Sequence, residues 1–477
     1  MELISIPFFL FFSITLIVYY SVENRYRNFI LLLFSAVFIS FFSVGFALYA
    51  FLSSGVNFLI GRLLPVLNGR KRLFVYYVGQ VFNIGGLIFF KYINFVFELI
   101  NGVIPQGWHF SIPYLDILVP VGISYYTFQG ISYLYLIFKA KDKPEGSFVN
   151  FSLFMLFFPK LLAGPIERHR IFLPQLRAER RFEDTDFTAG VRLFLWGALK
   201  KVAIADVLFV IVDSGVRDVH GLTALKSVIV FLMMPLYMYT DFSGYSDMAR
   251  GMGRMFGYRL SINFNFPLFS QSVSEFWRRW HISLSSWCND FIFVRFLLKH
   301  KKWGNYSFIY ATFITFIIIG LWHGASMSFV ILGVLQAVAI TVEFLTNRKR
   351  KKYFSDKNKL LVHILSSVYV YLFFAVSLSF FLTPSVRDAL TLISGGITGD
   401  WTNLYLGGFD IDELDTALSL MFVLIFFAIE LSAFVKKVSL EKLLPVKKTA
   451  RVLLYITGII LIIYFSKYQN VFIYENF

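Results

Sequence analysis

The sequence KHKKWGNYSFIYATFITFIIIGLWHGASMSFVILGVLQAVAITVEFLTNRKRKK, residues 299–352, decides the fold. Two apolar runs, Tyr306–Leu321 and a second that ends at Phe344, lie between a basic cluster at Lys299–Lys302 and another at Arg348–Lys352. Basic residues mark the cytoplasmic ends of membrane spans, so this pattern predicts a membrane hairpin with both ends at the cytoplasmic face. As a helix, the first run covers about 25 Å, which is most of the ~30 Å hydrocarbon core.

His323 falls in the turn of this hairpin, Trp322–Ser326, and is therefore expected deep in the membrane, at or just below its far side. An ionisable ring at that depth should face a cavity or a partner, because lipid solvates it poorly. A histidine that ends a helix and bonds a backbone carbonyl fits the local sequence equally well. The choice between these two readings depends on the rest of the chain.

The composition indicates an all-α, multi-pass membrane protein. Hydrophobic residues make up 57% of the 477 residues, and 59 of them are phenylalanine, which is more apolar surface than a soluble domain of this length needs. The net charge of +16 is expected to come from basic residues concentrated in the loops on one side of the membrane. It does not indicate a nucleic-acid partner, because the sequence has no basic module with interleaved aromatic residues. The single cysteine, Cys288, excludes an internal disulfide and a cysteine-based metal cluster, so no metal site is predicted. Residues 1–477 are expected to form one integral-membrane domain.

Apolar runs and their basic flanks predict a topology for the first half of the chain. Asn28–Leu52 has basic residues on both sides, so it is either a re-entrant element or a bent pair, and the topology of residues 21–72 stays open. Phe148–Phe158 is too short to cross and runs into prolines, which predicts a re-entrant element. Lys200 and Lys201 interrupt the run Asp186–Val212, which predicts a tilted helix partly at the interface. The other expected spans are Leu3–Tyr20 (retained rather than cleaved as a signal), Leu73–Ile100 and Gly122–Phe138.

In the second half, Asp241–Lys302 is polar and basic, which predicts helices that lie on or dip into the cytoplasmic leaflet. Residues 383–415 hold six acidic residues against one arginine and are expected outside. The terminal aromatic segment Phe472–Phe477 is expected at the outer interface. The other spans predicted in this half are Leu222–Tyr239, Leu360–Leu382, Ala417–Val435 and Leu453–Phe465.

The densest polar-aromatic stretch is Ser274–Trp287. Taken as one helix, it places Trp277, His281 and Leu284 on one stripe, and Trp280 and Trp287 one heptad apart. Glu275 and Arg279 then form an i,i+4 pair. One reading is an amphipathic interfacial helix with tryptophan anchors and an incidental histidine. The other is a site where adjacent arginines meet a phosphate-bearing ligand that enters from the cytoplasm.

A third stretch, Thr240–Gly251, contains small residues that permit close helix contact. Its Asp241 and Asp247 are expected to cap helices or to pair with Arg250 and Arg254. The chain has no Gly-x-Ser-x-Gly elbow, Walker loop, dinucleotide fingerprint or His-Glu-x-x-His, so no covalent nucleophile is evident. The histidines expected to be structural are His109, His169, His220, His300 and His363.

Six strings carry a resemblance to a known family: Pro159–Ile166, Asp241–Gly251, Asn263–Pro267, Glu275–Ser286, Leu321–Ala325 and Phe472–Tyr474. On these strings the chain resembles the membrane-bound O-acyltransferase (MBOAT) family, and most closely its branch of bacterial alginate O-acetyltransferase membrane subunits. The departures are Thr240 in place of an aromatic residue and Cys288-Asn289 in place of an aliphatic-basic pair. Neither departure touches His281 or His323.

The resemblance implies about eleven transmembrane helices plus re-entrant and interfacial helices around a central tunnel. It implies His323 as the catalytic histidine and His281 as a second catalytic position. Family members move an acyl group from a cytoplasmic thioester to a hydroxyl; in this branch the donor is acetyl-CoA, and no cofactor stays bound. The implied partner is an extracytoplasmic serine-hydrolase-like (SGNH-type) acetyltransferase that acts on a polysaccharide, and the implied location is the cytoplasmic (inner) membrane. The charge-derived topology agrees, since it places His281 at the cytoplasmic leaflet and His323 deep toward the outside.

The resulting hypothesis makes His323 the general base that takes the proton of an acceptor hydroxyl. An imidazole suits this role because its ordinary pKa is about 6.5. His281 would orient the thioester or hydrogen-bond its carbonyl oxygen. The residues expected to bind the acyl donor are Trp322, as a wall of the acyl pocket, Trp277, Trp280 and, at the CoA phosphates, Arg278 and Arg279.

Three alternatives stay open on the sequence. The donor could be another thioester, such as D-alanyl on a carrier protein. The chain could instead be a transporter or lipid flippase, although it shows no inverted repeat of the transporter kind. It could also be a scaffold of a surface-polymer complex. The acceptor, whether alginate, peptidoglycan or another polymer, is not encoded in any of these motifs.

Overall fold

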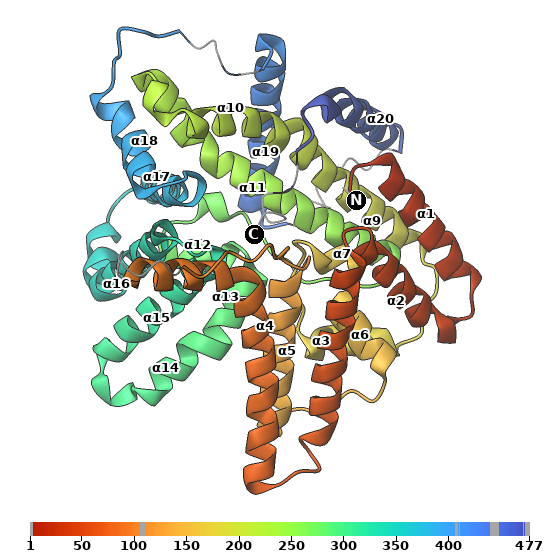
Figure 1. Cartoon of the computed structure of the whole chain (residues 1–477). Helices are drawn as coiled ribbons and strands as arrows, with labels where there is room; N and C mark the ends of the chain where they lie inside the picture. Colours follow the sequence, from red (N-terminus) through yellow and green to blue (C-terminus); the bar gives the residue numbers. More distant parts are fainter. Residues whose placement is uncertain are drawn as a thin grey trace. The chain divides into compact units, whose positions relative to one another are not determined.

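Helices account for all the regular secondary structure in the computed structural model, which describes residues 3–104, 111–405, 409, 411–438, 448–470 and 472 (Figure 1). No β-strand occurs in these ranges, so the all-α prediction is confirmed. Seven helices within them are long and apolar enough to cross a membrane, which agrees with a multi-pass protein. The expected number of about eleven spans stays a prediction. The seven are α3 (Val44–Leu63), α4 (Gly69–Val103), α11 (Ala224–Met255), α15 (Asn305–His323), α16 (Met327–Phe354), α17 (Lys359–Leu382) and α19 (Glu413–Lys436).

The chain divides into two compact units. The first unit comprises Met1–Gly190 and Ala249–Ser261, and the second comprises Val191–Met248 and Ile262–Phe477. The prediction of a single domain over residues 1–477 stays a prediction. His109 and Ile473–Phe477, which belong to the predictions for structural histidines and for the terminal aromatic segment, lie outside the described residues.

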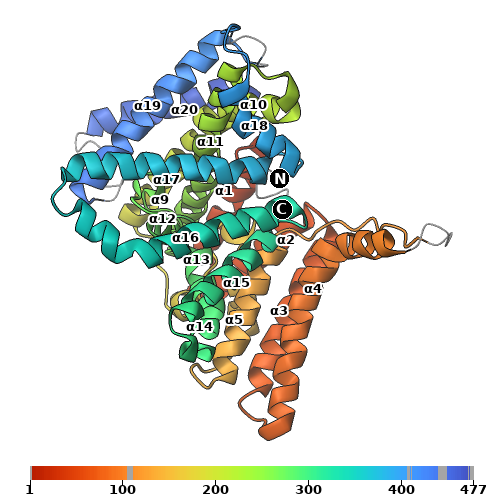
Figure 2. The same ribbon diagram turned by 90° about the vertical axis from the view of Figure 1, so that its left-hand side faces the viewer.

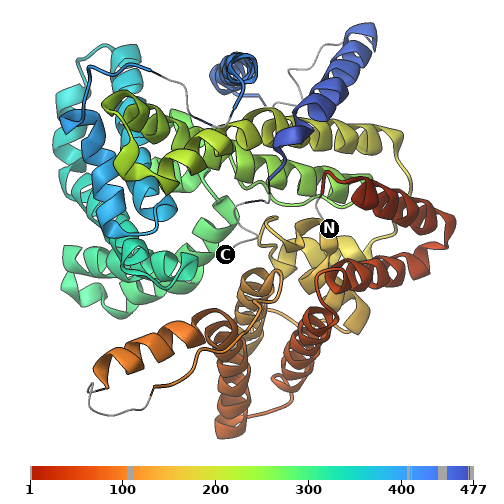
Figure 3. The ribbon, with the colours of Figure 1, turned by 45° about the horizontal axis from the view of Figure 1, so that its top comes forward.

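In the first unit, α1 (Ile6–Ser21) and α2 (Asn24–Ser40) lie side by side (Figure 3). The chain bends at residues 41–43 and continues as α3, so Asn28–Leu52 is divided between two helices, and its topology in the membrane stays a prediction. Helices α3, α4 and α5 (Ile123–Phe138) pack together (Figure 2). Asn57 of α3 and Asn83 of α4 exchange side-chain hydrogen bonds of 3.0 and 2.8 Å, and such amide pairs join helices inside a membrane.

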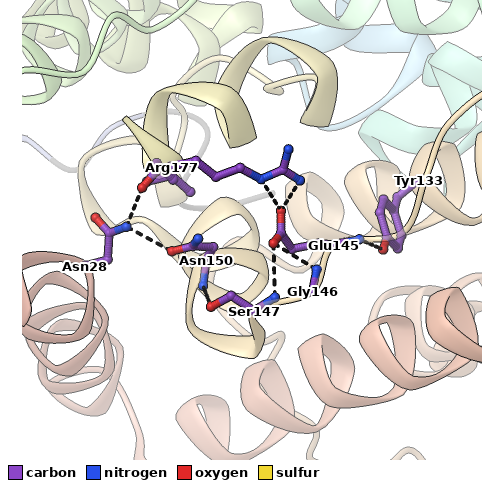
Figure 4. A network of polar contacts seen from close by, with 8 residues as sticks. Asn28, Tyr133, Glu145, Gly146, Ser147, Asn150 and Arg177 are labelled. Carbon is purple, nitrogen blue, oxygen red and sulfur yellow. Dashed lines mark hydrogen bonds and ion pairs between the residues drawn. The ribbon is translucent and has the colours of Figure 1, made fainter. Parts of the chain in front are cut away.

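The predicted re-entrant segment forms two short helices, α6 (Phe148–Leu156) and α7 (Phe158–Leu161), followed by α8 (His169–Arg177). A polar network fixes this region (Figure 4). The Glu145 carboxylate accepts hydrogen bonds from Arg177 and from the backbone amides of the two residues that follow it, and the Glu145 amide donates to Tyr133. Asn28 of α2 donates to Asn150 of α6 and to a carbonyl of α8. At the break between α6 and α7, the Phe158 amide donates to Ser35 Oγ at 3.2 Å, so this buried backbone group is also satisfied by protein.

Lys200 and Lys201 have partners inside the protein, while the tilt of their helix and its position at the interface stay predictions. Both lysines lie in a π-helical turn, η1 (Lys200–Ala205), between α9 (Asp184–Leu199) and α10 (Asp206–Arg217), and both are almost fully buried. Lys200 Nζ lies 2.7 Å from Asp247, and Lys201 Nζ lies 2.8 Å from Asp206 and 2.7 Å from Asp241. Burial is tolerated because each ammonium is paired with carboxylate. Asp241 and Asp247 lie inside α11, so they do not cap helices, and the alternative that they pair with Arg250 and Arg254 stays a prediction.

The stretch Asp241–Lys302 differs from its prediction in two ways. Helix α11 does not end at Tyr239 but runs on to Met255, because the carboxylates in its second half are satisfied by the buried lysines. The predicted helix Ser274–Trp287 is broken at His281, whose φ of 40° is left-handed. Short elements replace it: α12 (Val273–Arg279), α13 (Ile282–Cys288), the π-helical η4 (Asn289–Phe293) and α14 (Val294–Lys299).

The hairpin of α15 and α16 is confirmed, with its turn at residues 324–326. Helix α16 continues through the basic cluster to Phe354 instead of ending with the apolar run. The segment predicted as external, 383–415, contains the helix α18 (Val386–Thr398). In the described residues, the last α-helix is α20 (Lys448–Phe465), and the 3₁₀ turn η7 (Ser466–Tyr468) follows it.

Gly320 of α15 and Gly333 of α16 let the backbones of these two helices approach closely. We therefore expect Gly333→Ala to lower the stability of the protein. A Cβ at Gly333 would lie 2.4 Å from the Phe316 carbonyl oxygen, so the helices would have to separate. The measurement is the thermal unfolding midpoint in detergent. Gly55→Ala is the matched control, since nothing lies within 4 Å of a Cβ there and alanine favours a helix. Equal midpoints for the two variants would contradict the close approach at Gly333.

Candidate active site

The second unit contains a cavity of about 40 Å³ between α11, α12, α15, α16 and α17. Its wall is mostly aromatic and aliphatic, and among the described residues that line it, His323 is the one with an ionisable side chain. The lining residues are Met238, Trp277, Trp280, Phe316, Ile319, Gly320, His323, Leu332, Gly333, Gln336, Phe374, Ser377, Leu378 and Phe381.

His323 is the last residue of α15 and borders this cavity. Its side chain is nearly buried, and its ring packs edge-on against Phe381 with a centroid distance of 5.0 Å. Among the two readings of this histidine, its position favours the one in which the ring faces a cavity. A buried imidazole at the wall of a small apolar chamber can exchange a proton with a group that enters the chamber.

His281 lies at the break between α12 and α13, outside the seven long apolar helices. It is buried, and its ring meets Phe242 of α11 edge-on at 4.7 Å. Burial lowers the pKa of His281 to about 3, so the ring is neutral at physiological pH. A neutral imidazole can donate one hydrogen bond and accept another, which suits orientation of a ligand better than charge stabilisation.

Trp322 connects the two histidines. Its ring centroid lies 4.7 Å from that of His323 and 6.3 Å from that of His281. Trp322 is not among the residues that line the cavity, whereas Trp277 and Trp280 are. The indole of Trp322 therefore lies between the two histidines. Trp277 and Trp280, in α12 and directly after it, form part of the cavity wall instead.

The two arginines lie apart from the cavity wall. Arg279 forms the predicted i,i+4 pair with Glu275, at 2.9 Å, and also donates to the Asn265 carbonyl oxygen. The side chain of Arg278 is exposed. Of the histidines expected to be structural, His169 is buried and lies 2.6 Å from Asp142, which agrees with that expectation.

Sequence reasoning missed three polar residues of this region. Gln336 and Ser377 line the cavity, and Glu343 lies one heptad after Gln336 on α16. The Glu343 carboxylate accepts hydrogen bonds from the backbone amides of Val273 and Ser274, at 2.6 and 2.9 Å, and so holds the start of α12. The sequence did mark Gln336 and Glu343 as unusual, because they are polar residues inside an otherwise apolar run.

The model of the membrane-bound O-acyltransferase family, MBOAT, matches residues 108–386, which include every residue of the cavity wall. The chain belongs to the MBOAT family. The resemblance read from the six strings is thereby confirmed, and the multi-pass helical fold agrees with it.

Relatives of this MBOAT chain are named for the O-acetylation of alginate or peptidoglycan and for the D-alanylation of teichoic acid. It is 35% identical over 340 residues to a probable alginate O-acetylase, AlgI, of Pseudomonas aeruginosa, which is 70% of this chain and 64% of that protein. It is 30% identical over 361 residues to a peptidoglycan O-acetyltransferase of Helicobacter pylori, covering 70% of this chain and 66% of the relative. A teichoic acid D-alanyltransferase of Bacillus subtilis is 30% identical over 260 residues, with 52% of this chain and 64% of the relative covered. The match thus spans a little under two thirds of each of these proteins.

Proposed function

We propose that this protein is a membrane O-acyltransferase that passes an acetyl group from cytoplasmic acetyl-CoA through the membrane for the O-acetylation of an extracytoplasmic polysaccharide. The observation that carries the proposal is His323 at the wall of a small apolar cavity, within a chain of the MBOAT family. The location is the cytoplasmic membrane, and a secreted serine-hydrolase-like (SGNH-type) partner places the acetyl group on the polymer. Relatives named for alginate and peptidoglycan O-acetylation support this class of acceptor.

His323 acts as general base on the acceptor. As the hydroxyl oxygen bonds to the carbonyl carbon of the thioester, its proton passes to the imidazole. The carbon–sulfur bond then breaks, and the proton leaves with the thiol of CoA, which restores the neutral histidine. His281, neutral and in contact with Trp322, orients the thioester or hydrogen-bonds its carbonyl oxygen. The chemistry needs no covalent intermediate on this chain.

The cavity supports acetyl over D-alanyl as the acyl group. A volume of about 40 Å³ has room for about three water molecules, and so for about the three non-hydrogen atoms of an acetyl group. A D-alanyl group is larger and carries an ammonium, and no carboxylate in the cavity wall could pair with it. An unpaired ammonium in an apolar chamber is costly.

The acyl donor is proposed to reach the cavity past Trp277 and Trp280, with its phosphates near Arg278 and Arg279. Arg278 is exposed and so available to a phosphate, whereas Arg279 would have to share its guanidinium with Glu275. Arg278→Ala should therefore weaken donor binding more than Arg279→Ala does, as seen in KM for acetyl-CoA.

Purified full-length protein in proteoliposomes tests the proposal. Labelled acetyl-CoA and labelled D-alanyl carrier protein are supplied in parallel, with alginate or peptidoglycan fragments and an SGNH-type partner as acceptors. The expected result is thiol release and label transfer from acetyl-CoA only. Turnover of the D-alanyl thioester alone would overturn the choice of acyl group, and no turnover of either would overturn the function.

A further inference from the structure

A hydrogen-bonded chain of three side chains runs through the wall of the cavity. The indole Nε1 of Trp277 donates to Gln336 Oε1 at 3.0 Å, and Gln336 Nε2 donates to Ser377 Oγ at 2.8 Å. Ser377 in turn donates to a backbone carbonyl of its own helix, at 2.9 Å. Gln336 and Ser377 are nearly buried, so α12, α16 and α17 are joined at this point by polar contacts shielded from solvent.

Gln336 has two functions in this arrangement. Its side chain fills part of the cavity wall, and its amide fixes the plane of the Trp277 ring. Trp277 packs against Phe316, another wall residue, at a centroid distance of 5.0 Å. One heptad further along α16, Glu343 holds the start of α12, so the helix that carries Trp277 is held at both places by α16. These contacts fix the part of the cavity wall that Gln336 and Trp277 form.

We propose that Gln336 is a specificity-determining residue that limits the length of the acyl group, because it lines the cavity and holds Trp277 in place. This inference rests on the proposed function and concerns the same site. With room for about three non-hydrogen atoms, an acetyl group fits, while each further methylene must displace Gln336 or Trp277. A misfit of one methylene in an apolar pocket changes kcat/KM by about 10- to 200-fold.

The test uses acetyl-, propionyl- and butyryl-CoA with full-length protein in proteoliposomes, and measures kcat/KM for each donor. Gln336→Ala removes the side chain beyond Cβ and releases Trp277, so the butyryl-to-acetyl ratio should rise at least about 10-fold. Gln336→Asn keeps the amide on a shorter side chain and should raise only the propionyl-to-acetyl ratio. Gln336→Met fills nearly the same volume, so its ratios should stay near those of the wild type although the rate falls.

Val338→Ala is the matched control, since Val338 lies on the same helix but is 44% exposed and outside the cavity wall; its rates and ratios should equal those of the wild type. If Gln336→Ala does not fold, Gln336→Asn carries the test. Equal losses for all three donors in Gln336→Ala and Gln336→Asn would overturn the inference and make Gln336 purely structural. The wild type is assayed alongside: if it transfers no acyl group, the proposed function fails, and if it does while the ratios stay fixed, only this inference fails.

Discussion

His323→Ala should lower the rate of acyl transfer about 10²- to 10⁴-fold, which is the usual contribution of a general base. The physical reason is that His323 is the one ionisable side chain in the described cavity wall, so no neighbour there can take the proton of the acceptor. The measurement is thiol release from acetyl-CoA under single-turnover conditions, with equal amounts of folded protein. His323→Gln, which keeps polarity and much of the volume, should lose a similar factor.

His220→Ala provides the control for this experiment. His220 lies in the second unit like His323, but its side chain is 60% exposed and it is not part of the cavity wall. Its rate should equal that of the wild type. The thermal unfolding midpoint of His323→Ala should stay close to the wild-type value, apart from the loss of packing against Phe381. A variant that folds and keeps more than a tenth of the wild-type rate would remove His323 from the mechanism.

Lys201→Met should be the most destabilising single substitution among the buried charges. Lys201 is buried and lies within 2.8 Å of both Asp206 and Asp241, so its loss leaves two carboxylates buried without their shared cation. Breaking a buried ion pair from one side costs about 3–5 kcal/mol, a large fraction of the stability of most proteins. The expected result is a sharp fall in the yield of monodisperse protein and in the unfolding midpoint.

Two further variants separate charge from packing. The triple variant Lys201→Met, Asp206→Leu, Asp241→Leu removes all three charges and should recover most of the lost midpoint, since hydrophobic replacements of a buried ionic group are often tolerated. Arg217→Met breaks an exposed i,i+4 pair with Asp213 and should have little effect. A triple variant no more stable than Lys201→Met would show that the cost comes from packing rather than from unpaired charge.

The hairpin and the two histidines could be predicted because their signals are local in the sequence. The run Tyr306–Leu321, the turn at residues 324–326 and the basic flanks each depend only on neighbours along the chain. A place for His323 beside a cavity was one of the two readings that the local sequence allowed, and the structure favours it. The spacing and composition of the neighbouring residues are sufficient to predict the apolar run, the turn and the basic flanks.

The errors arose where tertiary contacts override a local pattern. The partners of Lys200 and Lys201 on α11, Asp247 and Asp241, are 47 and 40 residues away, so a local pattern does not reveal that both lysines are buried and paired. The prediction of one helix over Ser274–Trp287 rested on the stripe that contains His281. It did not allow for the left-handed backbone at His281, which breaks the helix there. The pairing of Gln336 with Trp277 depends on how α12 and α16 meet, although a lone glutamine in an apolar run could have marked it.

The backbone at His281 affects how that residue must be studied. With φ at 40°, the position favours glycine, asparagine, aspartate or histidine, and any other side chain adds strain of its own. An alanine there would change two things at once, the imidazole and the conformation of the link between α12 and α13. Asparagine or glycine removes only the ring, so the loss seen with either of them reports the chemistry of His281, and the excess loss with alanine reports the geometry of the turn.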